Sequence, residues 1–178
     1  MSITLLAMSG SLRAGSSNTA LLEAAALLAP VGVAVRQYRG LAELPAFNPD
    51  LDVEPLPAAV AALRAEIAAA DGLLISCPEY ARGIPGAFKN ALDWLVSGSE
   101  MPGKPVALFN ASPRGTEGQA ALRLVLRTIS ARLIEAAALE LPLLAKGLGA
   151  AAIAADPALA PPIVAALGAM ARAIRGEA

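Results

Sequence analysis

The sequence predicts an α/β protein with a doubly wound sheet of five parallel strands and helices on both faces. Short apolar runs alternate along the chain with longer segments whose apolar residues recur at helical spacing. Runs such as Leu73-Leu74-Ile75 and Val106-Ala107-Leu108-Phe109 have no polar alternation, which is typical of strands covered on both faces. Strands that alternate with helices are joined by right-handed crossovers, and such crossovers produce a parallel sheet.

The expected elements follow one another with no linker long enough to divide the 178 residues, so we expect one domain over 1–178. The expected strands are Ile3–Met8, Val33–Tyr38, Gly72–Cys77, Val106–Ala111 and Ala136–Leu141. The expected helices are Thr19–Ala29, Ala58–Ala70, Pro85–Ser97, Gln119–Leu133 and Pro162–Arg175. A proline-rich loop, Gly40–Pro57, follows the second strand, and Gly147–Ala155 permits a strand extension, a loop or a helix.

Composition restricts the class of protein. Hydrophobic residues make up 56% of the chain and the mean hydropathy is +0.58, but alanine supplies much of both. No uninterrupted apolar run approaches the roughly 18–20 residues of a membrane helix. The first residues, Met1-Ser2-Ile3-Thr4, lack the basic region of a signal peptide and lead directly into a strand pattern. We therefore expect a soluble, cytoplasmic protein that does not bind a membrane.

Charge and residue usage exclude several kinds of site. The net charge is −1 and the basic residues are scattered, which argues against a nucleic-acid surface. The chain has no histidine, which excludes a Ser-His-Asp triad, a Cys-His dyad and every histidine-ligated metal site. The single cysteine, Cys77, has no partner for an internal disulfide and reads best as a small core residue at a strand end. If the protein is an enzyme, we expect a cofactor to carry the chemistry.

The stretch Met8–Thr19, between the first strand and the first helix, predicts a phosphate-binding loop. Its turn offers backbone N–H groups, the helix N-terminus adds a positive dipole end, and small side chains let an anion approach closely. The side chains able to surround one phosphate are Ser11, Arg13, Ser16, Ser17 and Asn18. The alternative is an ordinary strand–helix connection in which Asn18 caps the helix and Arg13 is a solvated charge.

Two further loops are expected at the same edge of the sheet. Pro78–Gly86 follows the third strand, and Ser112–Gly118 follows the fourth. In open α/β sheets, ligands bind at the carboxyl ends of the strands near the point where the strand order reverses. A flat ligand with a phosphate tail would place its tail in the first loop and its ring between the other two.

These residues carry a resemblance to a known family. Gly10-Ser11-Leu12-Arg13, with Ser16 and Asn18, resembles the GSLRxxSxN phosphate loop of the NADPH-dependent FMN reductase family, which includes quinone, chromate and azo-dye reductases of flavodoxin-like fold. The family's PEY(N)xxxPGxLKNAxDW segment is similar to Pro78-Glu79-Tyr80, Ile84-Pro85-Gly86 and Lys89–Trp94. Its third loop is similar to Lys104-Pro105-Val106 leading to Ser112 and Gly115. The similarity covers about Ile3 to Leu133.

The resemblance implies a flavodoxin-like FMN-binding domain and a role for each matching residue. The residues implied to bind the FMN phosphate are Ser11, Arg13, Ser16, Asn18 and Thr19, with Ser17 beside them. Those implied to border the isoalloxazine, largely through backbone groups, are Pro78, Glu79, Tyr80 and Ala81, followed by Arg82 and Gly83. The other side would be closed by Ser112, Arg114 and Gly115. NAD(P)H would deliver a hydride to FMN, with no catalytic side chain, and electrons would pass to a quinone, free flavin or similar small acceptor.

The resemblance also implies a homodimer or homotetramer, because the helix after the second loop lies against a partner in that family. Trp94, at the end of this helix, is therefore either a core or an interface residue. Two positions depart from the family pattern: Ala81 stands where many members have Asn, and Arg82 where an aromatic residue is common. We hypothesise that Arg82 contacts a nucleotide phosphate. No loop carries a pattern that marks a 2′-phosphate site.

Two other functions compete with this prediction. One is a flavin-binding electron carrier or sensor without turnover, against which stand the aromatic content of 3% and the small net charge. The other is a nucleotide-binding protein that does not use flavin, against which stands the absence of GxxxxGK[ST] and GxGxxG motifs.

Overall fold

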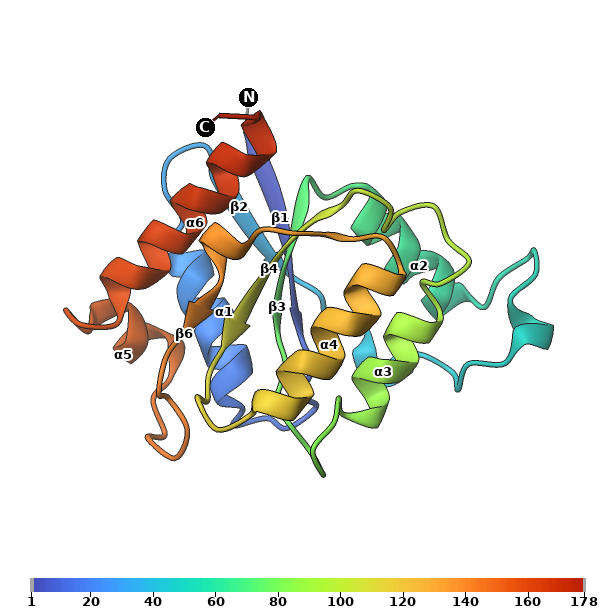
Figure 1. Ribbon diagram of the computed structural model, residues 1–178, viewed down its shortest axis with the longest axis horizontal. Helices are drawn as coiled ribbons and strands as arrows, with labels where there is room; N and C mark the ends of the chain where they lie inside the picture. The colour runs from blue at the N-terminus through green and yellow to red at the C-terminus, as the bar shows by residue number, and fades with distance from the viewer. Residues whose placement is uncertain (1, 178) are drawn as a thin grey trace.

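The computed structural model describes residues 2–177, and within them a parallel sheet lies between two groups of helices (Figure 1). The long strands are β1 (Ile3–Ser9), β2 (Val33–Gln37), β3 (Gly72–Ser76) and β4 (Pro105–Asn110). Two short strands, β5 (Arg132–Leu133) and β6 (Leu139–Glu140), both pair with β4. The order is β2-β1-β3-β4-β5, with parallel pairing. The predicted doubly wound parallel sheet is confirmed.

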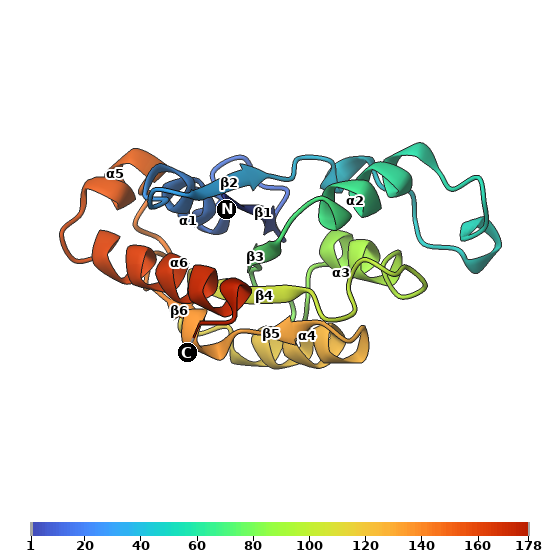
Figure 2. The same ribbon diagram turned by 90° about the horizontal axis from the view of Figure 1, so that it is seen from above.

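The helices cover both faces of the sheet, as predicted (Figure 2). One face carries α1 (Ser17–Leu27), α5 (Ala150–Ala155) and α6 (Ala160–Arg175). The other carries α2 (Ala58–Ala68), α3 (Gly86–Asp93) and α4 (Thr116–Thr128). Side chains alternate along β1, so that Leu5 faces α1 and its neighbour Leu6 faces the α2 side. Within residues 2–177, none of the helices combines the length and apolar character that a membrane crossing requires.

Two predicted elements near the sheet edge are wrong in their bounds. The helix predicted over Gln119–Leu133 ends at Thr128, because Ser130 adopts a positive φ of 60° and the chain turns back to the sheet. Of the strand predicted over Ala136–Leu141, only β6 (Leu139–Glu140) forms, because its start lies in a 3₁₀ turn, η3 (Glu135–Ala137); the short strand β5 falls at the end of the predicted helix instead. β5 and β6 each pair with β4 over only two positions. Between these two strands, the buried Ala137 packs in the core.

The ambiguous segment Gly147–Ala155 is a loop followed by the helix α5. Ile153 is its buried residue, and it packs with the residues of α1 and α6 in one core cluster. α1 begins at Ser17, two residues earlier than expected, and α6 ends at Arg175, where Gly176 caps it with a left-handed φ of 73°.

The proline-rich loop projects from the body beside α2 (Figure 1) and contains two 3₁₀ turns, η1 (Leu41–Glu43) and η2 (Pro49–Leu51). Trp94 helps to hold its base, because the indole Nε1 donates to the Pro45 carbonyl oxygen at 2.8 Å. The Trp94 side chain is fully buried within the chain and meets Phe47 edge to face, with 5.0 Å between ring centroids. Of the two readings of Trp94, the core reading is the one that the structure supports.

Candidate cofactor site at the carboxyl ends of the strands

The loop after β1 is shaped by hydrogen bonds among its own hydroxyl groups. Ser9 Oγ accepts a hydrogen bond from the Ser11 N–H at 3.3 Å and pairs with Thr19 Oγ1 at 2.8 Å. Ser11 Oγ accepts in turn from the Arg13 N–H at 3.3 Å. Such local bonds replace secondary structure in Ser/Thr-rich turns. Among residues 2–177, nothing forms a hydrogen bond or ion pair with the Arg13 guanidinium, which lies at the exposed tip of the loop.

The N-terminus of α1 leaves donors free toward this loop. The N-cap is Ser16 rather than Asn18: its Oγ accepts from the Thr19 N–H at 3.4 Å. The Asn18 side chain instead accepts the Ser76 hydroxyl on Oδ1 at 2.9 Å, which leaves its amide N–H groups to donate. Within the described chain the backbone N–H groups of Ser17 and Asn18 have no partner, as expected for a first helical turn.

Gly10 lets the ends of β1 and β3 come together. A Cβ on Gly10 would collide with Cys77 Sγ, and the Gly10 N–H donates to the Ser76 carbonyl oxygen at 2.8 Å. Burial raises the pKa of the Cys77 thiol to about 12. The thiol is therefore protonated at neutral pH, which supports a packing role for Cys77 and argues against a nucleophile.

In the second loop, the Glu79 side chain serves the fold. Its Oε2 accepts from the Gly118 N–H in the first turn of α4 at 2.6 Å, so the carboxylate lies at the positive end of that helix. A Cβ on Gly118 would stand only 3.0 Å from Glu79 Cβ and Cγ, so glycine permits this approach. The Glu79 side chain is therefore held toward α4 by one of its two oxygens.

Tyr80–Gly83 is a tight turn with two left-handed residues. The Tyr80 and Gly83 backbones exchange hydrogen bonds of 3.1 and 3.0 Å, and φ is 48° at Ala81 and 61° at Arg82. Turns with two positive φ values favour Asn and Gly at these places. The Arg82 guanidinium forms an exposed ion pair with Glu117, with 2.9 Å between Nη1 and Oε1.

The third loop is organised by Asn110, the last residue of β4. Asn110 Oδ1 accepts from the Ser112 N–H at 3.0 Å, and its Nδ2 donates to Glu140 Oε2 at 3.0 Å. Ser112 Oγ accepts from the Arg114 N–H at 3.4 Å, and the Ser112 carbonyl oxygen accepts from the Gly115 N–H at 3.3 Å. Sequence reasoning missed Asn110, although a polar residue at the end of an apolar strand was a usable signal.

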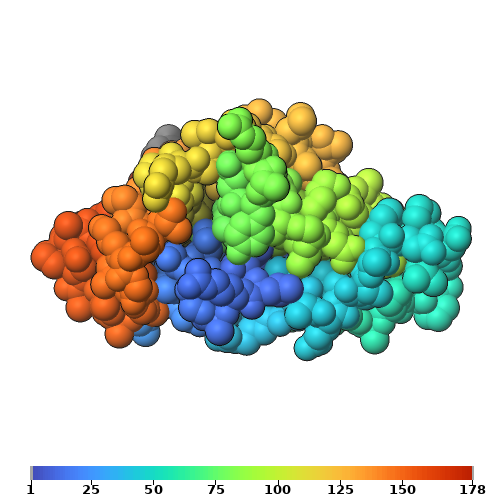
Figure 3. All heavy atoms as spheres, turned by 90° about the horizontal axis from the view of Figure 1, so that it is seen from below, coloured from blue at the N-terminus to red at the C-terminus, as the bar shows by residue number. Residues whose placement is uncertain are grey.

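These loops enclose a hollow of about 290 Å³, which we call the inner hollow. Figure 3, viewed from the carboxyl ends of the strands, shows a depression among the blue, green, yellow and orange segments. Of the predicted site residues, the inner hollow brings together Ser17, Asn18, Pro78, Glu79, Tyr80, Ser112, Arg114 and Gly115. It also contains residues that were not predicted as ligands: Cys77, Asn110, Ala111 and Leu144. Ala81, Arg82 and Gly83 are absent from this lining because they form the tip of the tight turn.

A second hollow of about 730 Å³, the outer hollow, lies on the β2 side of the phosphate loop. It takes in the remaining predicted phosphate residues, Ser11, Arg13, Ser16 and Thr19, and shares Ser17 with the inner hollow. Its other walls include the last residue of β2 and the residues just after it, and the segment 147–150, which leads into α5.

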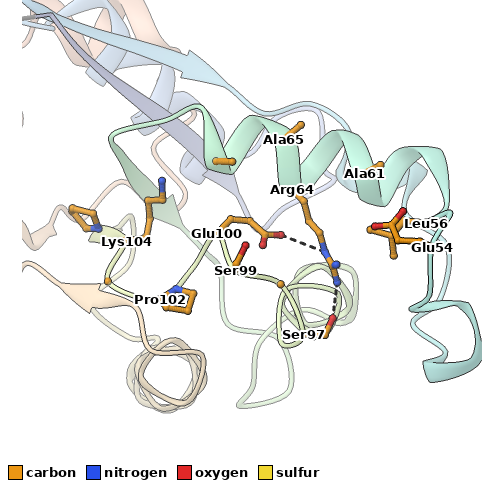
Figure 4. A pocket seen from close by; sticks show the side chains of 14 residues that line it. Glu54, Leu56, Ala61, Arg64, Ala65, Ser97, Ser99, Glu100, Pro102 and Lys104 are labelled. Carbon is orange, nitrogen blue, oxygen red and sulfur yellow. Dashed lines mark hydrogen bonds and ion pairs between the residues drawn. The ribbon is translucent and has the colours of Figure 1, made fainter.

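A third hollow, about 820 Å³, lies where β4 begins and is therefore at the opposite end of the sheet. In Figure 4 the Arg64 guanidinium points toward Glu100 and Ser97. Arg64 donates to the Trp94 carbonyl oxygen at 2.6 Å, and it pairs with Asp52 at 2.9 Å and Glu100 at 3.3 Å. This amino-end hollow is built around an ion-pair network that holds the projecting loop to α2 and α3.

The donors at the carboxyl ends suit a phosphate monoester. Free N–H groups of Ser17 and Asn18, the Asn18 amide and the Arg13 guanidinium all carry positive or donor character, and the predicted phosphate residues include no carboxylate. The inner hollow adds apolar walls, Pro78, Tyr80 and Leu144, of the kind that a flat ring requires. The observed residues therefore fit a ligand with a phosphate tail and a planar ring.

The strand order and the loop after β1 define a flavodoxin-like protein, and comparison with known proteins gives its family. The family model for NADPH-dependent FMN reductase matches residues 3–143, so the chain belongs to that family. The match extends about ten residues beyond the resemblance seen in the sequence.

Individual relatives agree with this assignment. An NAD(P)H-dependent FMN reductase of Pseudomonas aeruginosa is 41% identical over 112 residues, which cover 62% of this chain and 60% of the relative. A quinone reductase of Escherichia coli is 39% identical over 130 residues, covering 71% and 67%. Among solved structures, FerB, a flavoenzyme NAD(P)H:(acceptor) oxidoreductase of Paracoccus denitrificans, superposes with a TM-score of 0.82 at 26% identity over 98% of each chain.

Proposed function

We propose that this protein is an FMN-dependent NAD(P)H oxidoreductase that passes electrons to a quinone, free flavin or similar small acceptor. The observation that supports this function best is the convergence of a donor-rich loop and an apolar slot at the carboxyl ends of β1, β3 and β4. Family membership points in the same direction. The acceptor class is supported by the name of the Escherichia coli relative, quinone reductase.

In this proposal the loop after β1 holds the FMN phosphate. Arg13 supplies a mobile positive charge, and the first N–H groups of α1 supply fixed donors. The hydroxyl oxygens of Ser11 and Ser16 accept bonds that shape the loop and keep their O–H groups to donate to the phosphate, while Thr19 Oγ1 pairs with Ser9. Asn18, held by Ser76, directs its amide donors toward the same place.

The other two loops hold the ring. Pro78–Ala81 would meet its polar edge through backbone groups, with Arg82 and Gly83 completing the turn, while Ser112, Arg114 and Gly115 would close the opposite side. When bound, FMN supplies the ability to accept a hydride and to release electrons. The protein contributes position and the exclusion of water, and no side chain is assigned to proton transfer.

The experiment that tests this function is a pair of measurements on the purified protein. After incubation with FMN and desalting, the absorbance spectrum is expected to show close to one flavin per chain. Steady oxidation of NAD(P)H by a benzoquinone is then expected in the presence of FMN. Retained flavin without turnover would favour the electron carrier, and turnover without retained flavin would make FMN a substrate.

The proposal extends to the organisation of the protein. We propose a single domain over 1–178, active in the cytoplasm, where NAD(P)H is supplied, as a homodimer or homotetramer. The exposed side chains Tyr80 and Val96, which flank α3, would lie near a partner subunit in such an assembly. Light scattering coupled to gel filtration measures the oligomeric state, and a monomeric mass would refute the assembly while leaving the activity open to the previous test.

A further inference from the structure

One wall of the inner hollow comes from the segment after β6, which was not predicted as part of the site. Leu144 lines the hollow from this segment. The segment runs alongside the end of β4, where the Leu141 N–H donates to the Asn110 carbonyl oxygen at 2.8 Å. Farther along, the Leu143 carbonyl oxygen accepts from the Ser17 hydroxyl at 3.5 Å. The segment therefore connects the start of the third loop to the N-terminus of α1.

The side chain of Asn110, where this segment meets β4, is a buried amide at the end of an apolar strand. Its Oδ1 accepts from the Ser112 N–H and its Nδ2 donates to Glu140 Oε2, both at 3.0 Å. Strand pairing places Glu140 directly opposite Asn110. A buried amide is stable only when both of its ends are bonded. One end of this amide holds the third loop, and the other end is held by β6.

The carboxylate of Glu140 sets the direction of the Asn110 amide. An asparagine amide can rotate by half a turn, which exchanges its oxygen and its nitrogen, and only one orientation presents an acceptor to the Ser112 N–H. An ionised carboxylate has acceptors and no donor, so it can pair only with the amide nitrogen. The rotated amide would place oxygen against the carboxylate and nitrogen against the Ser112 N–H, and both hydrogen bonds would be lost. Glu140 therefore keeps Asn110 Oδ1 on the loop.

Packing does not fix this amide, because open space borders it on two sides. Away from the inner hollow, Asn110 borders a further hollow of about 370 Å³, the side hollow, which is lined by residues of α4 and β6. Asn110 and Gly115 line both hollows. Side chains in a close-packed core are held by the atoms around them, and here part of that support is absent. The hydrogen bond to Glu140 supplies the constraint instead.

We propose that Glu140 is a positioning residue for the flavin ring, acting through the Asn110 amide on the Ser112–Gly115 side of the inner hollow. The proposal rests on the FMN-dependent function proposed above, in which that side closes over the ring. Glu140 is exposed and lines the side hollow, whereas it is absent from the lining of the inner hollow. It therefore acts without touching the ring.

Hydrogen exchange at the Ser112 amide, followed by NMR, tests this positioning in the protein without FMN. Glu140→Ala frees the Asn110 amide to rotate, so the Ser112 N–H is expected to exchange about tenfold faster than in the wild-type protein, the effect of about one net hydrogen bond. Glu140→Gln keeps an oxygen that can accept from Asn110 and is expected to restore most of the protection. A wild-type exchange rate in Glu140→Ala would overturn the proposal.

Reversing the direction of the hydrogen bond tests the effect on FMN. In Asn110→Asp a second carboxylate faces Glu140, and the repulsion is expected to weaken FMN binding about tenfold, measured by quenching of flavin fluorescence. Adding Glu140→Gln supplies a donor to that new carboxylate, so the pair is restored in reverse with its net charge unchanged. The double variant is expected to regain most of the FMN affinity and the wild-type visible band of the bound flavin. A double variant no better than Asn110→Asp alone would overturn the proposal.

Glu135→Ala is the matched control. It removes a carboxylate from the same edge of the sheet, but one that pairs with Arg123 on α4, so FMN affinity and Ser112 exchange are expected to stay unchanged. Effects as large as those of Glu140→Ala would overturn the proposal, because any damage to the edge would then suffice.

Turnover separates this proposal from the proposed function. A wild-type protein that binds FMN but does not oxidise NAD(P)H would refute the oxidoreductase function, whereas a Glu140-dependent FMN affinity would still support the positioning role. Steady turnover together with an FMN affinity that does not depend on Glu140 would refute the positioning role and leave the function intact.

Discussion

The amino-end hollow and the outer hollow have similar volumes, about 820 and 730 Å³, but their arginines differ in what they already bind. The Arg64 side chain is only 17% exposed and is engaged by Trp94, Asp52, Ser97 and Glu100. By contrast, the Arg13 guanidinium has no partner among residues 2–177, and the Arg39 guanidinium has a single long contact, to Glu23. Volume alone therefore does not distinguish the two hollows as ligand sites. The state of the arginine donors differs between the two hollows, and it is the reason for proposing the ligand at the carboxyl end of the sheet.

Cys77 gives the largest expected effect, because it lines the inner hollow and yet is committed to the fold. With the pKa raised from 9.0 to about 12, the thiolate fraction at pH 8 is about a thousandfold lower than in the unfolded chain. We expect Cys77 to react with an aromatic disulfide reagent about a thousandfold faster in urea than in the native protein. Comparable rates would make Cys77 a reactive thiol of the site.

The same pKa predicts alkaline sensitivity. Since the folded-state pKa exceeds the unfolded one, the contribution of Cys77 to stability is complete below pH 9 and is lost as the pH rises toward 12. Unfolding by urea at a series of pH values measures this loss. Cys77→Ala is the control, in which this part of the pH dependence is expected to disappear.

Arg64→Met would break the amino-end network. It leaves Asp52 and the largely buried Glu100 without their cation, which typically costs about 3 kcal/mol in a buried pair. Urea unfolding is expected to show this loss of stability, while FMN affinity stays unchanged once the variant is folded. A large loss of FMN affinity in the folded variant would mean that the two ends of the sheet are coupled.

Arg13→Ala is expected to change ligand affinity and not stability. It is expected to weaken FMN binding by about 1.5–3 kcal/mol, the usual value of a hydrogen bond to a charged group, with little change in stability. Quenching of flavin fluorescence on titration measures the affinity. Arg127→Ala, an exposed arginine at the far end of α4, is the matched control. If the two variants bind FMN equally well, the phosphate lies elsewhere.

Ala81→Asn has the smallest expected effect. Ala81 has a φ of 48°, where asparagine is tolerated better than alanine. The substitution is expected to stabilise the protein by about 0.5–1 kcal/mol, by analogy with other replacements that suit the backbone conformation. Urea unfolding detects this increase. A loss of stability would show that the side chain at 81 is crowded by its neighbours.

Much of the fold was predictable because the central strands are continuous apolar runs, and such runs show in the sequence whatever surrounds them. The strands at the β4 edge of the sheet were not predictable, because β5 and β6 have two residues each and their pairing depends on β4. The loop after β1 was predictable as a Gly/Ser-rich turn from its local pattern, and its phosphate-binding role stays a prediction. The role of the Glu79 side chain was not predictable, because it depends on Gly118, 39 residues away in the sequence.

The interrupted edge of the sheet also bears on how molecules of this protein meet one another at high concentration. Beside β4, the outer strand consists of two short pieces separated by a 3₁₀ turn. Unpaired strand edges invite edge-to-edge association, and a long, flat edge is the most dangerous template. Here the turn breaks that template in the middle, and on the opposite edge β2 has only five residues, with the charged Arg36 among them. The sheet is thus protected at both sides against growth by addition of foreign strands.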